Sequence, residues 1–202
     1  MTETLAEYRT LVGDILATTV DSATWTTAIV DEALRHAINL YNRLPVYEIS
    51  FTVGASGREQ DLSTITDLDE ILAVGYPWRE GTDFAARMQD TRIIADQTLY
   101  FEACEPQADD VIRVRYTKQH KIEDLDSATS TNIAPRHARL LALAAASHAC
   151  TLRYRQLSEN PATPKEALDA LSIAAAQYID DARDLMASHR RGVNPKWTGT
   201  GL

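Results

Sequence analysis

Hydrophobic residues near the start of the chain recur at three- and four-residue steps, which is the spacing of one face of an α-helix. One such set spans residues 5–16 and a second spans residues 29–41. Thr26 or Thr27 can cap the second helix, and Pro45 stops it. The chain is therefore expected to begin with a pair of helices.

The period changes from helical to two after Pro45. Residues 46–53 alternate apolar and polar side chains, and Gly54 and Gly57 then turn the chain. Further strand candidates are Ile71–Tyr76, Arg92–Ile94, Thr98–Glu102 and Val111–His120. The pattern predicts four or five antiparallel strands in a small sheet or sandwich.

The helical period returns in the last third of the chain. A third helix is predicted from Pro135 to about Ser158, because proline suits the first helical position. Residues 160–162 break it, and residues 163–166 (Thr-Pro-Lys-Glu) form a capping box that starts a fourth helix. The alanine-rich run 141–149 suits close helix packing, either inside the protein or between subunits.

These patterns together predict an α+β fold with five parts. We expect a four-helix bundle with two N-terminal and two C-terminal helices, an inserted antiparallel β domain, a polar linker and an extended C-terminal arm. The expected ranges are 1–45 and 133–189 for the helical bundle, 46–122 for the β insertion, 123–132 for the linker and 190–202 for the arm.

The charge distribution bears on which partners the protein can bind. The net charge of −9 is concentrated in residues 54–133, with 16 acidic and 8 basic side chains, whereas residues 134–202 carry 6 acidic and 9 basic ones. An acidic body argues against sequence-specific binding of nucleic acid, which needs clustered Lys and Arg. It is compatible with DNA passing by without sticking, or simply with a solvated, soluble surface.

No apolar run is long enough to cross a bilayer, and the N-terminal Met-Thr-Glu-Thr-Leu is acidic where a signal peptide would be basic. We expect a protein made in a cytoplasm with no membrane segment. Cys104 and Cys150 are expected to be buried thiols, since structural disulfides are rare there.

The search for chemistry yields no catalytic, cofactor-binding or metal-binding residues. The histidines are scattered, and none has the spacing of a helical zinc site; they are His36, His120, His137, His148 and His189. Phosphate-binding glycine loops, nucleophile elbows and Cys-x-x-Cys pairs are missing from the sequence. We therefore expect that the protein is not an enzyme.

Two segments are candidates for binding. Tyr76–Arg79 joins aromatic rings to an arginine, and the lid of a small core is the favoured interpretation over a recognition patch. The end of the chain has too little apolar content to fold alone, so it is either a frayed tail or a segment that becomes ordered when Trp197 anchors it to a partner. The residues expected to make that contact are Arg190, Arg191, Val193, Pro195, Lys196 and Trp197.

The layout resembles the head-to-tail adaptor proteins of tailed bacteriophages. The resemblance rests on a proline-stopped second helix, Ala33–Pro45, on the strand Ile112-Arg-Val-Arg-Tyr116, and on the alanine-rich third helix, proline break and long fourth helix. It spans almost the whole chain and is closest to members with a β insertion, such as tail tubular protein A of short-tailed phages. It is a likeness of architecture without a diagnostic motif.

The resemblance implies a virion protein of the head-tail neck that assembles as a dodecameric ring under the portal and extends the DNA channel. It implies that Ser188–Leu202 grips the portal, and that the β insertion faces outward or toward a downstream tail or stopper protein. Two alternatives stay open: another phage tail-completion or assembly factor, and a non-enzymatic ligand-binding or regulatory domain built on the β layer.

Overall fold

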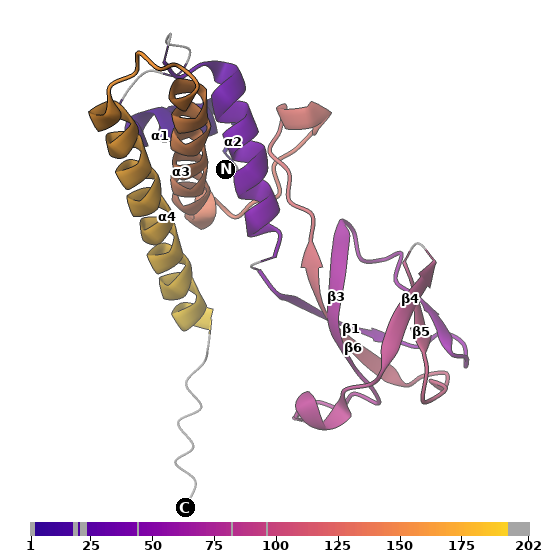
Figure 1. Cartoon of the computed structure of the whole chain (residues 1–202). Coiled ribbons are helices and arrows are strands. Elements are labelled where there is room, and N and C mark those ends of the chain that lie inside the picture. The colour runs from indigo at the N-terminus through magenta and orange to yellow at the C-terminus, as the bar shows by residue number, and fades with distance from the viewer. Residues whose placement is uncertain are drawn as a thin grey trace, which may run out of the picture. The chain divides into compact units, whose positions relative to one another are not determined.

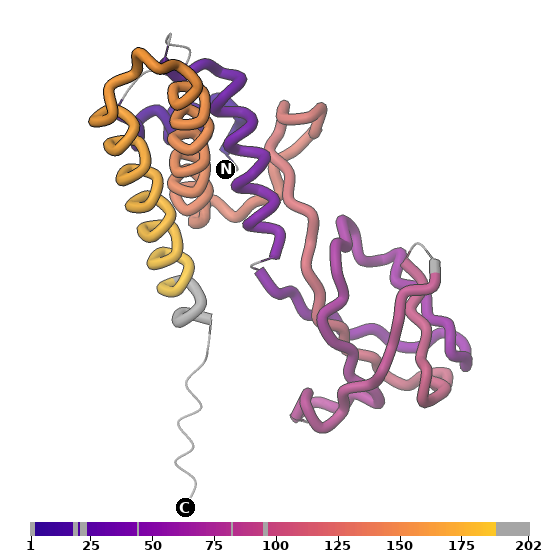
Figure 2. Tube along the Cα trace, in the orientation of Figure 1, coloured from indigo at the N-terminus to yellow at the C-terminus, as the bar shows by residue number. Residues whose placement is uncertain are grey.

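The protein has an α+β fold, as the sequence pattern predicts. The computed structural model describes residues 3–17, 20, 24–43, 45–81, 83–95 and 97–193. In these residues the chain runs through two helices, six strands and two further helices. The helices and strands form two compact units, which are described separately: a helical unit (Met1–Asn39 with Lys121–Leu202) and a β unit (Leu40–His120). Figure 2 shows the indigo start of the chain beside its orange last third in the helical unit.

Both N-terminal helices begin at threonine caps. Helix α1 (Leu5–Ile15) starts with a capping box, in which the Thr4 hydroxyl accepts from the Glu7 amide and the Glu7 carboxylate accepts from the Thr4 amide at 2.6 Å. Helix α2 (Thr27–Tyr41) is capped by Thr26, whose hydroxyl accepts from the Ile29 amide at 3.4 Å. Each cap satisfies backbone donors that the first helical turn leaves unpaired.

Helix α3 (Ala138–Ser158) is the central element of the helical unit. It packs against α1 and α4 (Lys165–Val193), and its alanine-rich first half is buried. The Ser147 hydroxyl donates to the Ala175 carbonyl at 2.7 Å, and the Tyr178 hydroxyl on α4 donates to the Ile15 carbonyl at 3.0 Å. The small side chains therefore serve intramolecular packing, one of the two roles that the sequence left open.

The C-terminal helix differs from its prediction at both ends. Thr163 was expected to cap α4, but its hydroxyl donates to the Leu157 carbonyl at 2.9 Å and so closes the turn after α3. At the other end α4 continues to Val193, past Arg190, where the extended arm was predicted to begin. Gly192 is tolerated there because a glycine weakens a helix by only about 1 kcal/mol.

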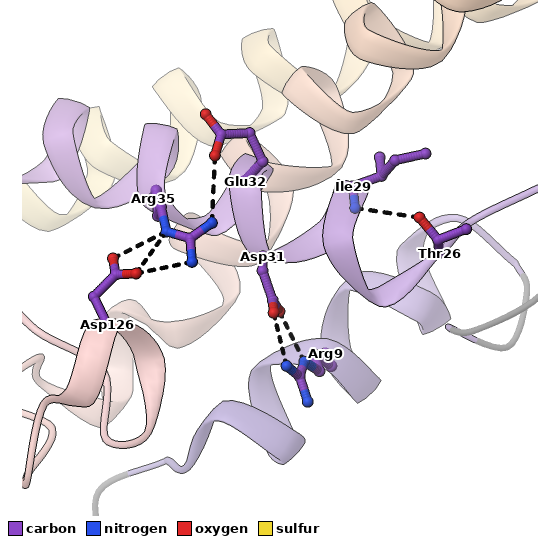
Figure 3. A network of polar contacts seen from close by, with 7 residues as sticks. All are labelled: Arg9, Thr26, Ile29, Asp31, Glu32, Arg35 and Asp126. Atoms are coloured by element: carbon purple, nitrogen blue, oxygen red, sulfur yellow. Dashed lines mark hydrogen bonds and ion pairs between the residues drawn. The ribbon is translucent and has the colours of Figure 1, made fainter.

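Ion pairs fasten α2 to its neighbours in the helical unit (Figure 3). Arg9 on α1 makes a bidentate pair with Asp31, with both N–O distances at 2.8 Å. Arg35 pairs with Asp126, in the segment that follows the β unit, and with Glu32 on its own helix. The polar segment predicted as a linker is thus tied to α2, and its Leu125 is buried.

The β unit contains two small antiparallel sheets among the described strands. The first has the order β1 (Tyr47–Thr52), β6 (Val111–Lys118), β3 (Leu68–Gly75), and the second has the order β2 (Glu59–Asp61), β5 (Thr98–Phe101), β4 (Thr91–Ala95). The inner faces share one core; its most buried members are Val53, Leu62, Ile65, Val74, Leu99, Phe101, Ile112 and Val114. The wholly polar β2 was not predicted, since Glu59-Gln60-Asp61 has no apolar alternation.

A larger side chain at a buried position of α3 tests how tightly this helix is packed in the helical unit. Ala145 is fully buried, so Ala145→Leu adds three carbon atoms where there is no room and is expected to destabilise the helical unit by about 1–3 kcal/mol. The matched control is Ala170→Leu on the exposed side of α4, expected to change stability by less than about 0.5 kcal/mol. Urea unfolding followed by far-UV circular dichroism measures both, and equal effects would show that α3 is not tightly packed.

Candidate functional site

The residues predicted to bind a partner lie at the limit of the described chain. Arg190, Arg191 and Val193 belong to the last turns of α4, where only the backbone is described. Pro195, Lys196 and Trp197 lie outside the described residues. The predicted C-terminal contact therefore stays a prediction.

The loop Tyr76–Arg79 is built into the β unit. Tyr76 is part of the core, and its hydroxyl donates to Asp110 at 2.5 Å while accepting from the Gln107 amide at 3.2 Å. Burial, together with the hydrogen bond to Asp110, raises the pKa of this phenol. Tyr76 thus serves the core, in line with the lid interpretation.

The outer face of the β1-β6-β3 sheet carries a group that we call the arginine–aromatic surface: Glu48, Trp78, Phe84, Arg113 and Arg115. The Arg113 guanidinium lies 4.6 Å from the Trp78 ring centroid, and that of Arg115 lies 4.0 Å from the Phe84 ring centroid. The two rings are 5.7 Å apart. Glu48, opposite Arg115 in the register, pairs with Arg115 at 2.6 Å and also with Arg113.

Two aromatic rings lie over Gly75 in β3. A Cβ atom there would be in ordinary van der Waals contact, at 3.4 Å, with carbon atoms of both the Phe84 and Trp78 rings, so the rings lie directly against the sheet. Arg113 and Arg115 are each held between an aromatic ring and Glu48, which occupies their charges. The arrangement stabilises the outer face, and contains neither a nucleophile nor an acid–base pair of the kind used in hydrolysis.

A second polar group joins the two ends of the β unit. Asn42 precedes β1, and its Oδ1 accepts from the backbone amide of His120, after β6, at 2.8 Å. The same oxygen lies 3.1 Å from His120 Nδ1, and His120 Nε2 lies 3.0 Å from the Tyr47 hydroxyl. An amide oxygen only accepts, so Nδ1 carries the proton and Nε2 accepts from Tyr47. Sequence inspection missed this contact, which joins residues 78 positions apart.

Two histidines from different helices stack in the helical unit. The rings of His36 on α2 and His148 on α3 have centroids 3.8 Å apart and are nearly parallel, at 11°. Burial lowers the pKa of His148, and the charges of His36 and Arg155 lower it further, against Glu32, which raises it. The lowered pKa favours the neutral form of His148 in this stack.

The two cysteines are the remaining candidates for chemistry; Cys150 is buried as expected, whereas Cys104 is partly exposed. Cys104 and Cys150 are free thiols, and burial raises the pKa of Cys150 to about 11. Among the described residues, the search for three or more His, Cys, Asp or Glu side chains placed to hold a metal ion finds no group. A search of the same residues finds no helix with the length and hydrophobicity to span a membrane.

The Glu48 ion pairs predict a pH-dependent stability. Burial raises the pKa of Glu48, but hydrogen bonds and charge from Arg115 and Arg113 outweigh this and hold it below its ordinary value. The stabilisation is therefore complete above the ordinary glutamate pKa of about 4.3 and is lost as pH falls through the lower, folded-state pKa.

Glu48→Gln should accordingly lower the stability of the β unit at neutral pH, and the difference from the unmodified chain should shrink to nothing in strong acid. Urea unfolding at a series of pH values measures it. Glu59→Gln, which removes an exposed carboxylate from β2, is the matched control. A difference between Glu48→Gln and the unmodified chain that stays constant with pH would contradict the assignment.

Comparison with known proteins gives no assignment. No protein-family model matches the chain, and no curated protein matches its sequence. The function is therefore argued from the architecture and surfaces described above.

Proposed function

We propose that the chain is a head-to-tail adaptor of a tailed bacteriophage, a virion protein that forms a ring, a dodecamer by its resemblance, beneath the portal. Residues 1–45 and 133–189 would form its four-helix bundle, and residues 46–122 an inserted β domain. The observation that carries the proposal is the division of the chain, in which both ends build the helical unit and the middle builds the β unit. That is the architecture that the resemblance implies.

Ring formation requires two different surfaces on each subunit, because neighbours meet head to tail. Helix α4 offers one such surface on the side away from α3: Ile173 is 67% exposed and lies between Asp169 and Asp180 along the helix. Helix α3 exposes Arg155 near its C-terminal end, a side chain of opposite charge. An acidic, partly apolar surface and a basic one can complement each other when helical bundles stand side by side.

The acidic balance of the chain suits a channel wall. Its net charge of −9 gives phosphate groups little to bind, so DNA would pass through without sequence-specific contacts. The β domain would provide the attachment surface for the downstream tail or stopper protein. In this proposal the protein acts by assembly and has no catalytic role.

Mass measurement tests the ring directly. The purified chain of 22.4 kDa and the portal protein of the same phage are examined separately and mixed, by native mass spectrometry and particle imaging. Twelve copies bound to one portal ring are the expected result. A chain that stays monomeric with excess portal would contradict the proposal, and would favour a ligand-binding domain.

The C-terminal arm is tested by a chain ending at Val193, which keeps α4 whole. Loss of the Trp197 anchor is expected to weaken portal binding by about 2 kcal/mol or more, roughly thirtyfold, and Trp197→Ala alone should give most of the effect. Thr198→Ala with Thr200→Ala is the matched control within the same segment. Unchanged portal affinity in the shortened chain, measured by interferometry, would exclude the arm while leaving the ring open.

A further inference from the structure

A cleft of about 780 Å³ lies inside the β unit, between strands β3 and β4. One wall is formed by β3 from Leu68 to Val74, and the other by residues 88–93, which include the start of β4. Leu99 on the neighbouring strand β5 contributes to the lining between them. The cleft shares no residue with the arginine–aromatic surface.

Both walls are edges of sheets. Among the described strands, β3 is the last strand of one sheet and β4 the last strand of the other. The segment before β4 is hydrogen-bonded to the chain where β3 ends: the Gln89 amide donates to the Val74 carbonyl and the Tyr76 amide to the Arg87 carbonyl, both at 2.9 Å. Before that point the cleft is lined by β3 on one side and by residues 88–93 on the other, and Figure 1 shows β3 and β4 as separate arrows.

The cleft gathers exposed apolar side chains. Leu72 on β3 is 45% exposed, Met88 is 56% exposed and Ile93 on β4 is 47% exposed, and all three line it. Ile94, next to Ile93, is also exposed. Single exposed apolar residues are ordinary, but several along one cleft are typical of a binding surface.

The charged side chains that line the cleft favour a positively charged partner. Asp69, Glu70 and Asp90 line the cleft with a single arginine, Arg92, which is already engaged by Glu102 at 3.5 Å and by the ring of Tyr100. Nucleic acid would be repelled, and so would the same edge of a second copy, which carries the same carboxylates. A segment that brings Lys or Arg is complementary.

We propose that this cleft binds an extended segment of a partner protein, which adds as a β-strand between β3 and β4. Backbone groups of the two edges would hold it, as in other cases of strand addition. Alternate side chains of an added strand point to opposite faces, so one set would be apolar, toward Val74 and Leu99, and the other basic, toward the carboxylates. The proposal does not depend on whether the chain forms a ring.

The test uses the full chain and two synthetic heptapeptides, Lys-Val-Lys-Ile-Lys-Val-Lys and the same peptide with Glu in place of Lys. Binding is followed by fluorescence anisotropy, and the site is located by amide hydrogen exchange. The basic peptide is expected to bind at least about tenfold more tightly than the acidic one, to weaken with salt, and to slow exchange at residues 68–74 and 91–94.

Two variants report on the site. Leu72→Lys places a positive charge on the β3 wall, and Glu70→Gln with Asp90→Asn removes two exposed carboxylates without touching the core. Each should weaken the basic peptide at least about tenfold. Val46→Lys, which changes an equally exposed apolar residue that does not line the cleft, is the matched control and should bind normally.

Three results would overturn the proposal. They are a Kd weaker than about 1 mM for the basic peptide, equal affinity for the acidic one, or binding that neither cleft variant weakens while exchange at residues 68–74 is unchanged. Circular dichroism of each variant shows that it is folded.

Discussion

The hydrogen-bonded group of Asn42, His120 and Tyr47 holds together the two ends of the β unit. The chain enters that unit at Leu40 and leaves it at His120, and the hydrogen bond between Asn42 and His120 brings these two ends of the segment together. His120 is only 5% exposed, and its backbone amide and imidazole both use the Asn42 side chain. A buried imidazole with both nitrogens satisfied fixes the start of β1 against the end of β6.

With its two ends joined in this way, the β unit has a hydrophobic core of its own, separate from the core of the helical unit. The helical unit completes its core with α1, α2, α3 and α4 from both ends of the chain, and the β unit completes its core between two small sheets. Each sheet of three described strands keeps two edge strands, and one from each sheet, β3 and β4, lines the cleft. The unused edges are therefore a consequence of splitting the strands into two sheets instead of one.

The sequence predicted what depends on local periodicity. The helical stripes, the cap at Thr26 and most strands are visible because burial of one face requires a repeat of 3.6 or 2. The capping box at Thr4 and Glu7 carries the same signal as the one expected at Thr163 and could have been found. At Thr163 the hydroxyl instead donates to the Leu157 carbonyl in the turn between α3 and α4, a contact that the local pattern does not indicate.

The candidate surfaces were less predictable, because they depend on which strands become neighbours. The alternation of Arg113 and Arg115 along β6 was visible, but nothing local indicates that Trp78 and Phe84 fold over them or that Glu48 lies opposite. The cleft is even harder to predict from the sequence, since it is lined by edge strands from two different sheets.

The arginine–aromatic surface and the cleft differ in how much exposed charge and apolar area each offers to a partner. On the arginine–aromatic surface, Glu48 and two rings already occupy the guanidinium groups, so binding a partner there would first have to break internal pairs. In the cleft, the carboxylates of Glu70 and Asp90 are exposed beside exposed apolar side chains. Because unmaking buried or stacked pairs costs free energy and covering exposed apolar area gains it, the cleft is the better binding surface of the two.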